Sequence, residues 1–210
     1  MSKPIFELFV IKNNVANAMA QKSLSDADKK ALFDKEAASR TAVNATFIAF
    51  CDSAWADEET PNWGLVRYPD LAARIKHTQS LRDIGWLDYY HAFSLLGTSD
   101  TEPTPVTIPN PIYKLWVVKS NPAAQLALAN VSKADSDAVL EKHNAVYKET
   151  GSSILISCDS YWSNEAYSSF GVSIYPNIEA NQKVTQTLTD LGWRKYFDSF
   201  TLLGTPITVT

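Results

Sequence analysis

Cysteine, glycine and histidine are scarce in this 210-residue sequence, which has two, seven and three of them. Two cysteines do not supply the disulfide framework of a small secreted domain. Glycine-rich phosphate loops are absent, and so are the HExxH, CxxC and EF-hand patterns of metal sites. We therefore expect no metal site, no phosphate-binding loop and no fold that depends on disulfide bonds.

Long apolar runs and an excess of basic charge are also missing. Purely apolar runs are short, as at 154–156, so no membrane-spanning segment is expected. The net charge of −4 does not predict the basic face of a nucleic-acid-binding protein. The first ten residues, MSKPIFELFV, do not have the pattern of a secretory signal. Together with the low cysteine content, this favours a cytoplasmic protein.

The sequence contains an internal repeat with a shift of 107 residues. CDSAW at 51–55 returns as CDSYW at 158–162. KPIFELFVIKNN at 3–14 likewise returns as NPIYKLWVVKSN from 110. Such similarity at a fixed spacing indicates duplication of one structural unit. We predict repeat 1 over 1–99, a Pro/Thr-rich linker over 100–109 and repeat 2 over 110–210.

Each repeat shows the same predicted order, β-α-β-β-α-β, which is that of a ferredoxin-like unit. The first strand is rich in β-branched and aromatic residues, and Ser25 and Ser132 are typical helix N-caps. Asp70 and Asn177 each follow Tyr-Pro and should begin the second helix, which Gly85 or Gly192 should end. The predicted ranges are strands 5–12 and 112–119, helices 25–43 and 132–150, strands 46–53 and 153–160, strands 63–68 and 170–175, helices from 70 to 85 and from 177 to 192, and strands 91–97 and 198–204.

This pattern resembles the dimeric α+β barrel superfamily. The likeness lies in the element order, in YPD and YPN at 68–70 and 175–177, and in GWLDYY and GWRKYF at 85–90 and 192–197. The last of these is similar to the GWYDYF of small members of the superfamily. The resemblance implies an α+β fold in which the two repeats form an intrachain, pseudo-dimeric barrel, as a monomer or homodimer. Members include monooxygenases, haem-degrading enzymes, chlorite dismutases, cyclases, dehydratases and binding proteins, so the fold leaves the function open.

The repeated motif contributes two cysteines and two aspartates. Cys51 and Cys158 have no histidine partner that occurs in both repeats, and we interpret them as buried packing residues. In the implied barrel they lie apart, so no disulfide is expected between them. Asp52 and Asp159 are candidate general bases in an apolar interior, or else acceptors for amides of the turn that follows. Their presence in both repeats favours the turn role.

Positions that differ between the repeats are candidates for a function confined to one of them. Arg67, opposite Ile174, is a candidate anchor for a carboxylate or enolate, or a strand-end residue that reaches solvent. His91, opposite Asp198, is a candidate acid or base, or a surface residue. Three further contrasts are Glu7 with Lys114, Val66 with Ser173, and Phe50 with Ser157.

Aromatic residues are abundant enough to line a pocket for a flat organic ligand. The candidates are Tyr68, Tyr175, Tyr113 and Trp116, together with Trp55 and Trp162, which alternatively pack the hairpin loop. Some relatives in the resembled superfamily bind haem through a helical histidine, which makes His77 and His143 candidate ligands. A lone helical histidine is more often a surface residue, so haem is an alternative to a site without a cofactor.

Three functions are therefore open. The first is binding of a small, partly apolar organic molecule in the barrel, with cofactor-independent proton transfer (isomerase, cyclase or lyase chemistry) or oxygenation by Asp52, Asp159, His91 and Arg67. The second is ligand binding without turnover, and the third is a structural protein with a filled barrel. Whether the protein is an enzyme is left undecided.

Overall fold

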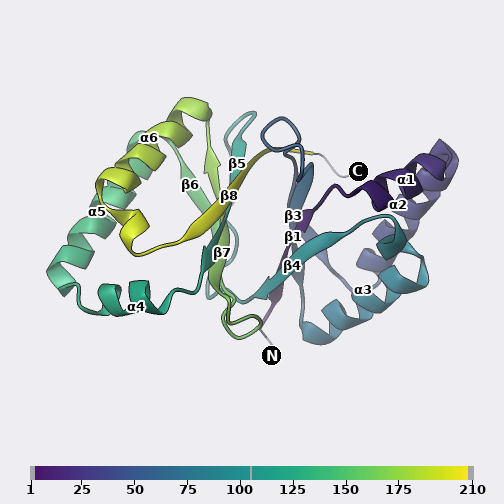
Figure 1. Ribbon diagram of the computed structural model, residues 1–210, viewed down its shortest axis with the longest axis horizontal. Helices are drawn as coiled ribbons and strands as arrows, with labels where there is room; N and C mark the ends of the chain where they lie inside the picture. Colours follow the sequence, from purple (N-terminus) through teal and green to yellow (C-terminus); the bar gives the residue numbers. More distant parts are fainter. Residues whose placement is uncertain (1–2, 105, 208–210) are drawn as a thin grey trace. The chain divides into compact units, whose positions relative to one another are not determined.

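The computed structural model of the protein describes residues 3–104 and 106–207 (Figure 1). The described chain divides into two compact units. Unit 1 contains the residues up to Ser99 together with Ile207, and unit 2 runs from Asp100 to Pro206. Residue 105 of the predicted linker lies outside the described residues. The rest of 100–109 has no helix or strand, and the amide of Thr104 donates to the carbonyl of Leu155 at 2.8 Å.

Unit 1 is an antiparallel four-stranded sheet with the strand order β4-β1-β3-β2. This order, with helices in the two crossovers, is ferredoxin-like. Its elements are β1 (Ile5–Ile11), α1 (Val15–Ser23), α2 (Asp26–Thr41), β2 (Thr46–Asp52), β3 (Asn62–Tyr68), α3 (Leu71–Asp83), the 3-10 turn η1 (Trp86–Asp88) and β4 (Ala92–Gly97).

Unit 2 has the same element order, and its antiparallel strands follow the order β8-β5-β7-β6. Its elements are β5 (Ile112–Lys119), α4 (Pro122–Ala129), α5 (Lys133–Glu149), β6 (Ser153–Asp159), β7 (Tyr167–Tyr175), α6 (Ile178–Asp190), the 3-10 turn η2 (Trp193–Lys195) and β8 (Ser199–Pro206).

Local signals in the sequence set most helix boundaries. The side chain of Ser25 accepts the amide of Asp28 at 3.1 Å, and the hydroxyl donates to the Asp28 carboxylate at 2.6 Å. Asp70 caps α3 by accepting the amide of Ala73 at 2.8 Å. Gly85, with φ 74°, adopts the left-handed conformation predicted for the residue after this helix. Ser132, Asn177 and Gly192 do the same in unit 2.

The sequence interpretation missed the helices α1 and α4. Asn14 caps α1 by accepting the amide of Asn17, and Asn121 caps α4 by accepting the amide of Ala124. Pro122 at the first helical position fits α4 because no intrahelical partner awaits its missing amide hydrogen. The third strand of unit 2 also begins earlier than predicted, at Tyr167 rather than at 170.

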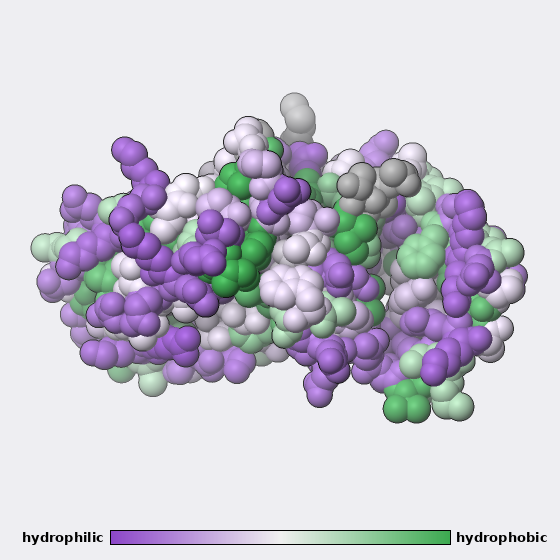
Figure 2. All heavy atoms as spheres, turned by 90° about the horizontal axis from the view of Figure 1, so that it is seen from above, coloured by the Kyte–Doolittle hydropathy of each residue, from purple (hydrophilic) through white to green (hydrophobic). Residues whose placement is uncertain are grey.

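In each unit the helices cover one face of the sheet (Figure 1). Because strand residues alternate between faces, Glu7 and Phe9 of β1 point toward the helices, while Leu8 and Val10 point away. Hydrophilic side chains dominate the face seen in Figure 2. None of the helices in the described chain is long and apolar enough to cross a membrane.

Candidate functional site

Each unit contains a cavity between its helices and the sheet face that they cover. The cavity of unit 2 has a volume of about 620 Å³, and that of unit 1 about 390 Å³. Both volumes lie in the range of small-molecule sites. In unit 2, β5 supplies Lys114, Trp116 and Val118, which are alternate residues on one face of the strand. The candidate site is thus built by the strand period and the covering helices.

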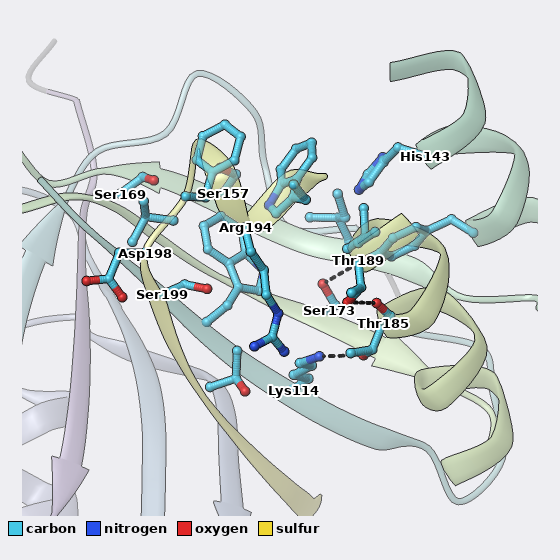
Figure 3. Close-up of a pocket in the computed structure, with 18 of the residues that line it drawn as sticks. Lys114, His143, Ser157, Ser169, Ser173, Thr185, Thr189, Arg194, Asp198 and Ser199 are labelled. Carbon is cyan, nitrogen blue, oxygen red and sulfur yellow. Dashed lines mark hydrogen bonds between the residues drawn. The ribbon is translucent and has the colours of Figure 1, made fainter. Parts of the chain in front are cut away.

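The walls of the unit 2 cavity are largely aromatic and aliphatic (Figure 3). Trp193 stacks on Phe197, with ring centroids 4.4 Å apart, so η2 and the short segment between it and β8 form one aromatic wall. Such walls suit a flat apolar ligand. The apolar and aromatic lining residues are Trp116, Val118, Tyr147, Ile154, Tyr175, Leu188, Trp193 and Phe197.

His143 projects from α5 toward this cavity (Figure 3) and is only 9% exposed. Its ring is nearly parallel to that of Trp193, at 16° and a centroid distance of 5.6 Å. Nδ1 lies 3.2 Å from the side-chain oxygen of Asn144, which acts as its acceptor. The proton then sits on Nδ1, and Nε2 keeps a lone pair that a metal ion could accept.

Two cations, Lys114 and Arg194, lie on the opposite side of the cavity from His143 (Figure 3). Lys114 Nζ donates to the hydroxyl of Thr185 at 3.0 Å. Burial lowers the pKa of Lys114, and the nearby Arg194 guanidinium lowers it further. Within the described residues, neither cation forms an ion pair with a carboxylate. Asp198 also lines the cavity, but its carboxylate lies 3.4 Å from Lys119 Nζ.

A neutral hydrogen-bonded chain completes the unit 2 site. The hydroxyl of Tyr147 lies 3.1 Å from Ser173 Oγ and 3.1 Å from the hydroxyl of Tyr175. Burial, with the neighbouring Tyr147, raises the pKa of Tyr175, so its hydroxyl stays protonated. The lining therefore combines aromatic walls, a histidine, neutral hydroxyls and two cations without a carboxylate partner. This arrangement favours a flat ligand that carries negative charge.

The unit 1 cavity differs because its charges compensate each other. The carboxylate of Glu7 accepts from Arg74 at 2.5 Å and from the hydroxyl of Tyr68 at 3.0 Å. The same hydroxyl lies 2.8 Å from His77 Nδ1. His77 is 4% exposed, so this helical histidine is buried rather than at the surface, where such residues more often lie.

Besides the candidate haem ligands His77 and His143, the structure places four of the predicted site residues at a cavity. Trp116 and Tyr175 line the cavity of unit 2, while Tyr68 and His91 line that of unit 1. Arg67 lies between Val66 and Tyr68 on β3, so it points to the opposite face of the sheet. By the same alternation, Tyr113 points away from the cavity that Lys114 and Trp116 line.

The other predicted site residues lie at the hairpin turns, outside both cavities. The carboxylate of Asp52 accepts the amide of Ala54 at 3.0 Å, and that of Asp159 accepts the amide of Tyr161 at 3.0 Å. These are the turn contacts that the sequence analysis favoured for the two aspartates. Trp55 and Trp162 follow in the same turns and are 49% and 46% exposed.

Both cysteines are free and buried. Burial raises the pKa of the Cys158 thiol to about 12 and that of Cys51 further. Neither thiol is therefore an activated nucleophile near neutral pH. In the described chain, no three His, Cys, Asp or Glu side chains are placed to hold a metal ion together.

Sequence reasoning missed Arg194, which was interpreted only as part of the GWRKYF motif after a helix. The comparison of the repeats gave a better signal. The contrasting pairs Glu7 with Lys114, Val66 with Ser173, Phe50 with Ser157 and His91 with Asp198 all line the two cavities. Applied to the same motif, this comparison places Leu87 opposite Arg194 and would have identified the second cation.

No protein-family model matches the chain, and no curated protein matches its sequence. Solved structures do match it. A mutant chlorite dismutase from Candidatus Nitrospira defluvii has a TM-score of 0.73 at 9% identity, covering 99% of this chain and 93% of that one. A heme-binding protein from Thermus thermophilus has a TM-score of 0.73 at 6% identity, covering 99% and 92%. At these identities the likeness establishes the fold alone: this chain has the ferredoxin-like α+β fold of chlorite dismutase-like proteins.

Proposed function

We propose that the unit 2 cavity binds a flat, largely apolar, anionic molecule of the haem type, with His143 as the iron ligand. The observation that carries the proposal is the composition of the cavity. His143 lies on one side, and Lys114 and Arg194 lie on the other without a carboxylate partner in the described chain. Lys114 is half-buried and Arg194 is exposed, and the two neighbouring positive charges repel each other unless an anion compensates them.

The residues present fit haem as a chemical group. Haem is a planar aromatic ring with two carboxylates and an iron that accepts an imidazole nitrogen. The aromatic walls match the ring, and His143 Nε2 has a free lone pair because Nδ1 is hydrogen-bonded to Asn144. The two cations match the carboxylates, to which charge-assisted hydrogen bonds are strong.

Each lining residue has a distinct task in this proposal. Asn144 fixes the tautomer and orientation of His143, as outer partners of metal-binding histidines generally do. Lys114 and Arg194 orient and neutralise the carboxylates, while Trp193 and Phe197 exclude water from the apolar ring. Bound haem would supply a redox-active iron centre to this site.

The solved structures support the proposal because chlorite dismutase and a heme-binding protein have the same fold. They move haem ahead of the cofactor-free function that the sequence analysis put first. The reaction, if any, does not follow from a shared fold.

Titration of the purified protein with haemin tests the proposal. We expect a Soret band and a 1:1 stoichiometry in the wild-type protein. His143→Ala should abolish the ligand-dependent spectrum, whereas His91→Ala, which changes an exposed histidine of unit 1, should leave it intact. Equal binding by both variants, or no Soret band with the wild-type protein, would contradict the proposal.

A second candidate is cofactor-free binding of a small aromatic carboxylate, with proton transfer or oxygenation at the same cavity. It is favoured by the hydroxyl chain Tyr147–Ser173–Tyr175, which offers neutral proton donors to such a ligand. Calorimetry with 2-naphthoate distinguishes the two. Binding of naphthoate that survives His143→Ala, without binding of haemin, would favour this second function.

We further propose that the two units arose by duplication and that their uncovered sheet faces close an intrachain barrel. The repeat in the sequence, the shared strand order and the apolar residues that point away from the helices, such as Leu8 and Leu115, support this. A protein of residues 1–99 alone should then self-associate into a dimer in sedimentation experiments, and a stable monomer would argue against the barrel.

A further inference from the structure

We infer that the unit 1 cavity is a second, separate binding site, for a flat neutral aromatic molecule that donates one N–H or O–H hydrogen bond to His77. This site is independent of the proposed haem site because all of its lining residues belong to unit 1. The inference rests on the shape of the cavity, on a buried acceptor without a partner and on the charge balance around it.

The lining of the unit 1 cavity suits an aromatic ring. The ring centroids of Phe9 on β1 and Phe50 on β2 are 6.1 Å apart. Trp86 stacks on Tyr90, with ring centroids 4.3 Å apart. These rings line the cavity between the sheet and the helices. Its volume of about 390 Å³ exceeds what a single aromatic bicycle needs, so a ligand of that size can be enclosed.

The hydrogen-bond chain fixes which atom faces the ligand. The Tyr68 hydroxyl donates to Oε2 of Glu7, whose other oxygen, Oε1, accepts from Arg74. The Tyr68 oxygen then accepts from His77, which places the imidazole proton on Nδ1. His77 Nε2 is left as a lone-pair acceptor.

In the described structure, His77 Nε2 is buried and has no hydrogen-bond partner. The closest carboxylate oxygen is Oε1 of Glu36 at 3.8 Å, which is itself an acceptor and cannot donate. Glu36 and His77 both line the cavity. Since a buried polar atom without a partner is costly, the geometry favours a ligand that donates to Nε2.

The charges around this cavity select a neutral ligand. Glu7 pairs with Arg74, and Glu36 pairs with Arg40 at 3.1 Å, so the two acidic and two basic groups cancel. An ionised ligand would enter without a compensating charge, at a large desolvation cost. An aromatic ligand with a single N–H or O–H group can donate that hydrogen to His77 Nε2. The rest of such a ligand then contacts the apolar walls of the cavity.

The test uses the full chain labelled with 5-fluorotryptophan and observed by 19F NMR. Indole carries one N–H donor, and benzofuran has the same shape with an oxygen in its place. We expect indole to shift the Trp86 signal, assigned with Trp86→Phe, and benzofuran to bind at least tenfold more weakly. Equal affinities, or no shift with either probe, would overturn the inference, since a water molecule would then satisfy Nε2.

Two matched variants locate the probe. Ser94 lines the unit 1 cavity and is exposed, so Ser94→Phe should fill the cavity without disturbing the core and weaken indole binding at least tenfold. Thr201 is its counterpart in unit 2, and Thr201→Phe should leave indole binding unchanged. The reverse pattern would place the probe in unit 2 and contradict the inference.

His77→Phe should remove the preference of the site for indole over benzofuran, and a retained preference would also contradict the inference.

Discussion

Glu7 and Lys114 occupy equivalent positions on the first strands of the two units, and each faces the helices of its own unit. Glu7 lies opposite Val66 on β3, and Lys114 lies opposite Ser173 on β7. Glu7 meets a guanidinium from α3, whereas Lys114 meets the hydroxyl of Thr185. One unit thus has a compensated cluster in its cavity, and the other has positive charge available for a ligand.

Replacing Lys114 separates stability from ligand binding. Lys114→Met removes a partly buried cation whose pKa is lowered by burial and by Arg194, so the free energy of unfolding should rise by about 1 kcal/mol. The affinity for haemin should fall at least tenfold, because one carboxylate partner is lost. Urea denaturation and a haemin titration measure the two effects. Lys133→Met, at a position 87% exposed and outside the cavity lining, serves as the control and should change neither.

His77 makes stability depend on pH in the acid range. Burial, followed by the charges of Arg74 and Arg40, lowers its pKa to about 4. In the unfolded chain this imidazole therefore binds a proton near pH 6.5, whereas in the folded protein it stays neutral at that pH. The contribution of neutral His77 to the free energy of unfolding is therefore complete above pH 6.5. As pH falls from 6.5 to 4, the free energy of unfolding should fall by about 3 kcal/mol because of this group.

The measurement is the free energy of unfolding from pH 7 to 4, compared between the wild-type protein and His77→Phe. The variant should lose the part of the slope that comes from this histidine, whereas the exposed His91→Ala should keep it. Identical slopes in the wild-type protein and His77→Phe would show that the group does not titrate as described. The charged and titratable groups around His77 are Glu7, Glu36, Arg40, Tyr68 and Arg74.

Tyr68 and Tyr175 form a matched pair at the ends of β3 and β7. Tyr68→Phe removes a hydroxyl that bonds both Glu7 and His77, so it should lower the free energy of unfolding by about 2 kcal/mol. Tyr175→Phe removes a hydroxyl that contacts Tyr147 and Ser173, but these two stay hydrogen-bonded to each other, so the loss should be about 1 kcal/mol or less. Chemical denaturation at pH 7 measures both. A larger loss for Tyr175→Phe would contradict this ordering.

Gly171 is required because Trp116 lies over it. A Cβ at this position would collide with the indole of Trp116 and with the carbonyl oxygen of Ile156. Gly171→Ala should therefore lower the free energy of unfolding by about 2 kcal/mol and displace a wall of the unit 2 cavity. At Gly64 the added Cβ would meet the Phe9 ring and, at 3.0 Å, the carbonyl oxygen of Ala49.

Gly64→Ala should lower the free energy of unfolding less than Gly171→Ala does, because the Phe9 ring can move away from the added Cβ more easily than the backbone can. Thermal denaturation of both variants, with near-ultraviolet circular dichroism to report on Trp116, tests the order. Equal stability of Gly171→Ala and the wild-type protein would show that the indole moves freely.

The element pattern was accessible from the sequence because its signals are local. The serine caps, the Tyr-Pro exits from the third strands and the left-handed glycines after α3 and α6 depend on neighbours a few residues away. The helices α1 and α4 were missed although Asn14 and Asn121 carry a local cap signal, because the sequence between the first strand and the next cap was treated as a connection.

The candidate site could be predicted only in part. Trp116 and Tyr175 were proposed, on composition, for a pocket inside the barrel, and they line a cavity between the sheet of unit 2 and its helices. Tyr113 was proposed on the same grounds and Arg67 on its contrast with Ile174, and both point to the sheet faces that the helices do not cover, since residue type does not reveal which strand face a helix covers.

By itself the sequence determined two similar ferredoxin-like units, their helix caps and the positions at which the two units differ, because periodicity and capping act over short distances. Only the tertiary structure decided that Lys114 of β5, His143 of α5 and Arg194 of η2 line one cavity, and that His77 meets Tyr68 and, through it, Glu7. Those groupings depend on how helices pack on the sheet, which joins residues far apart in the chain and leaves no local pattern.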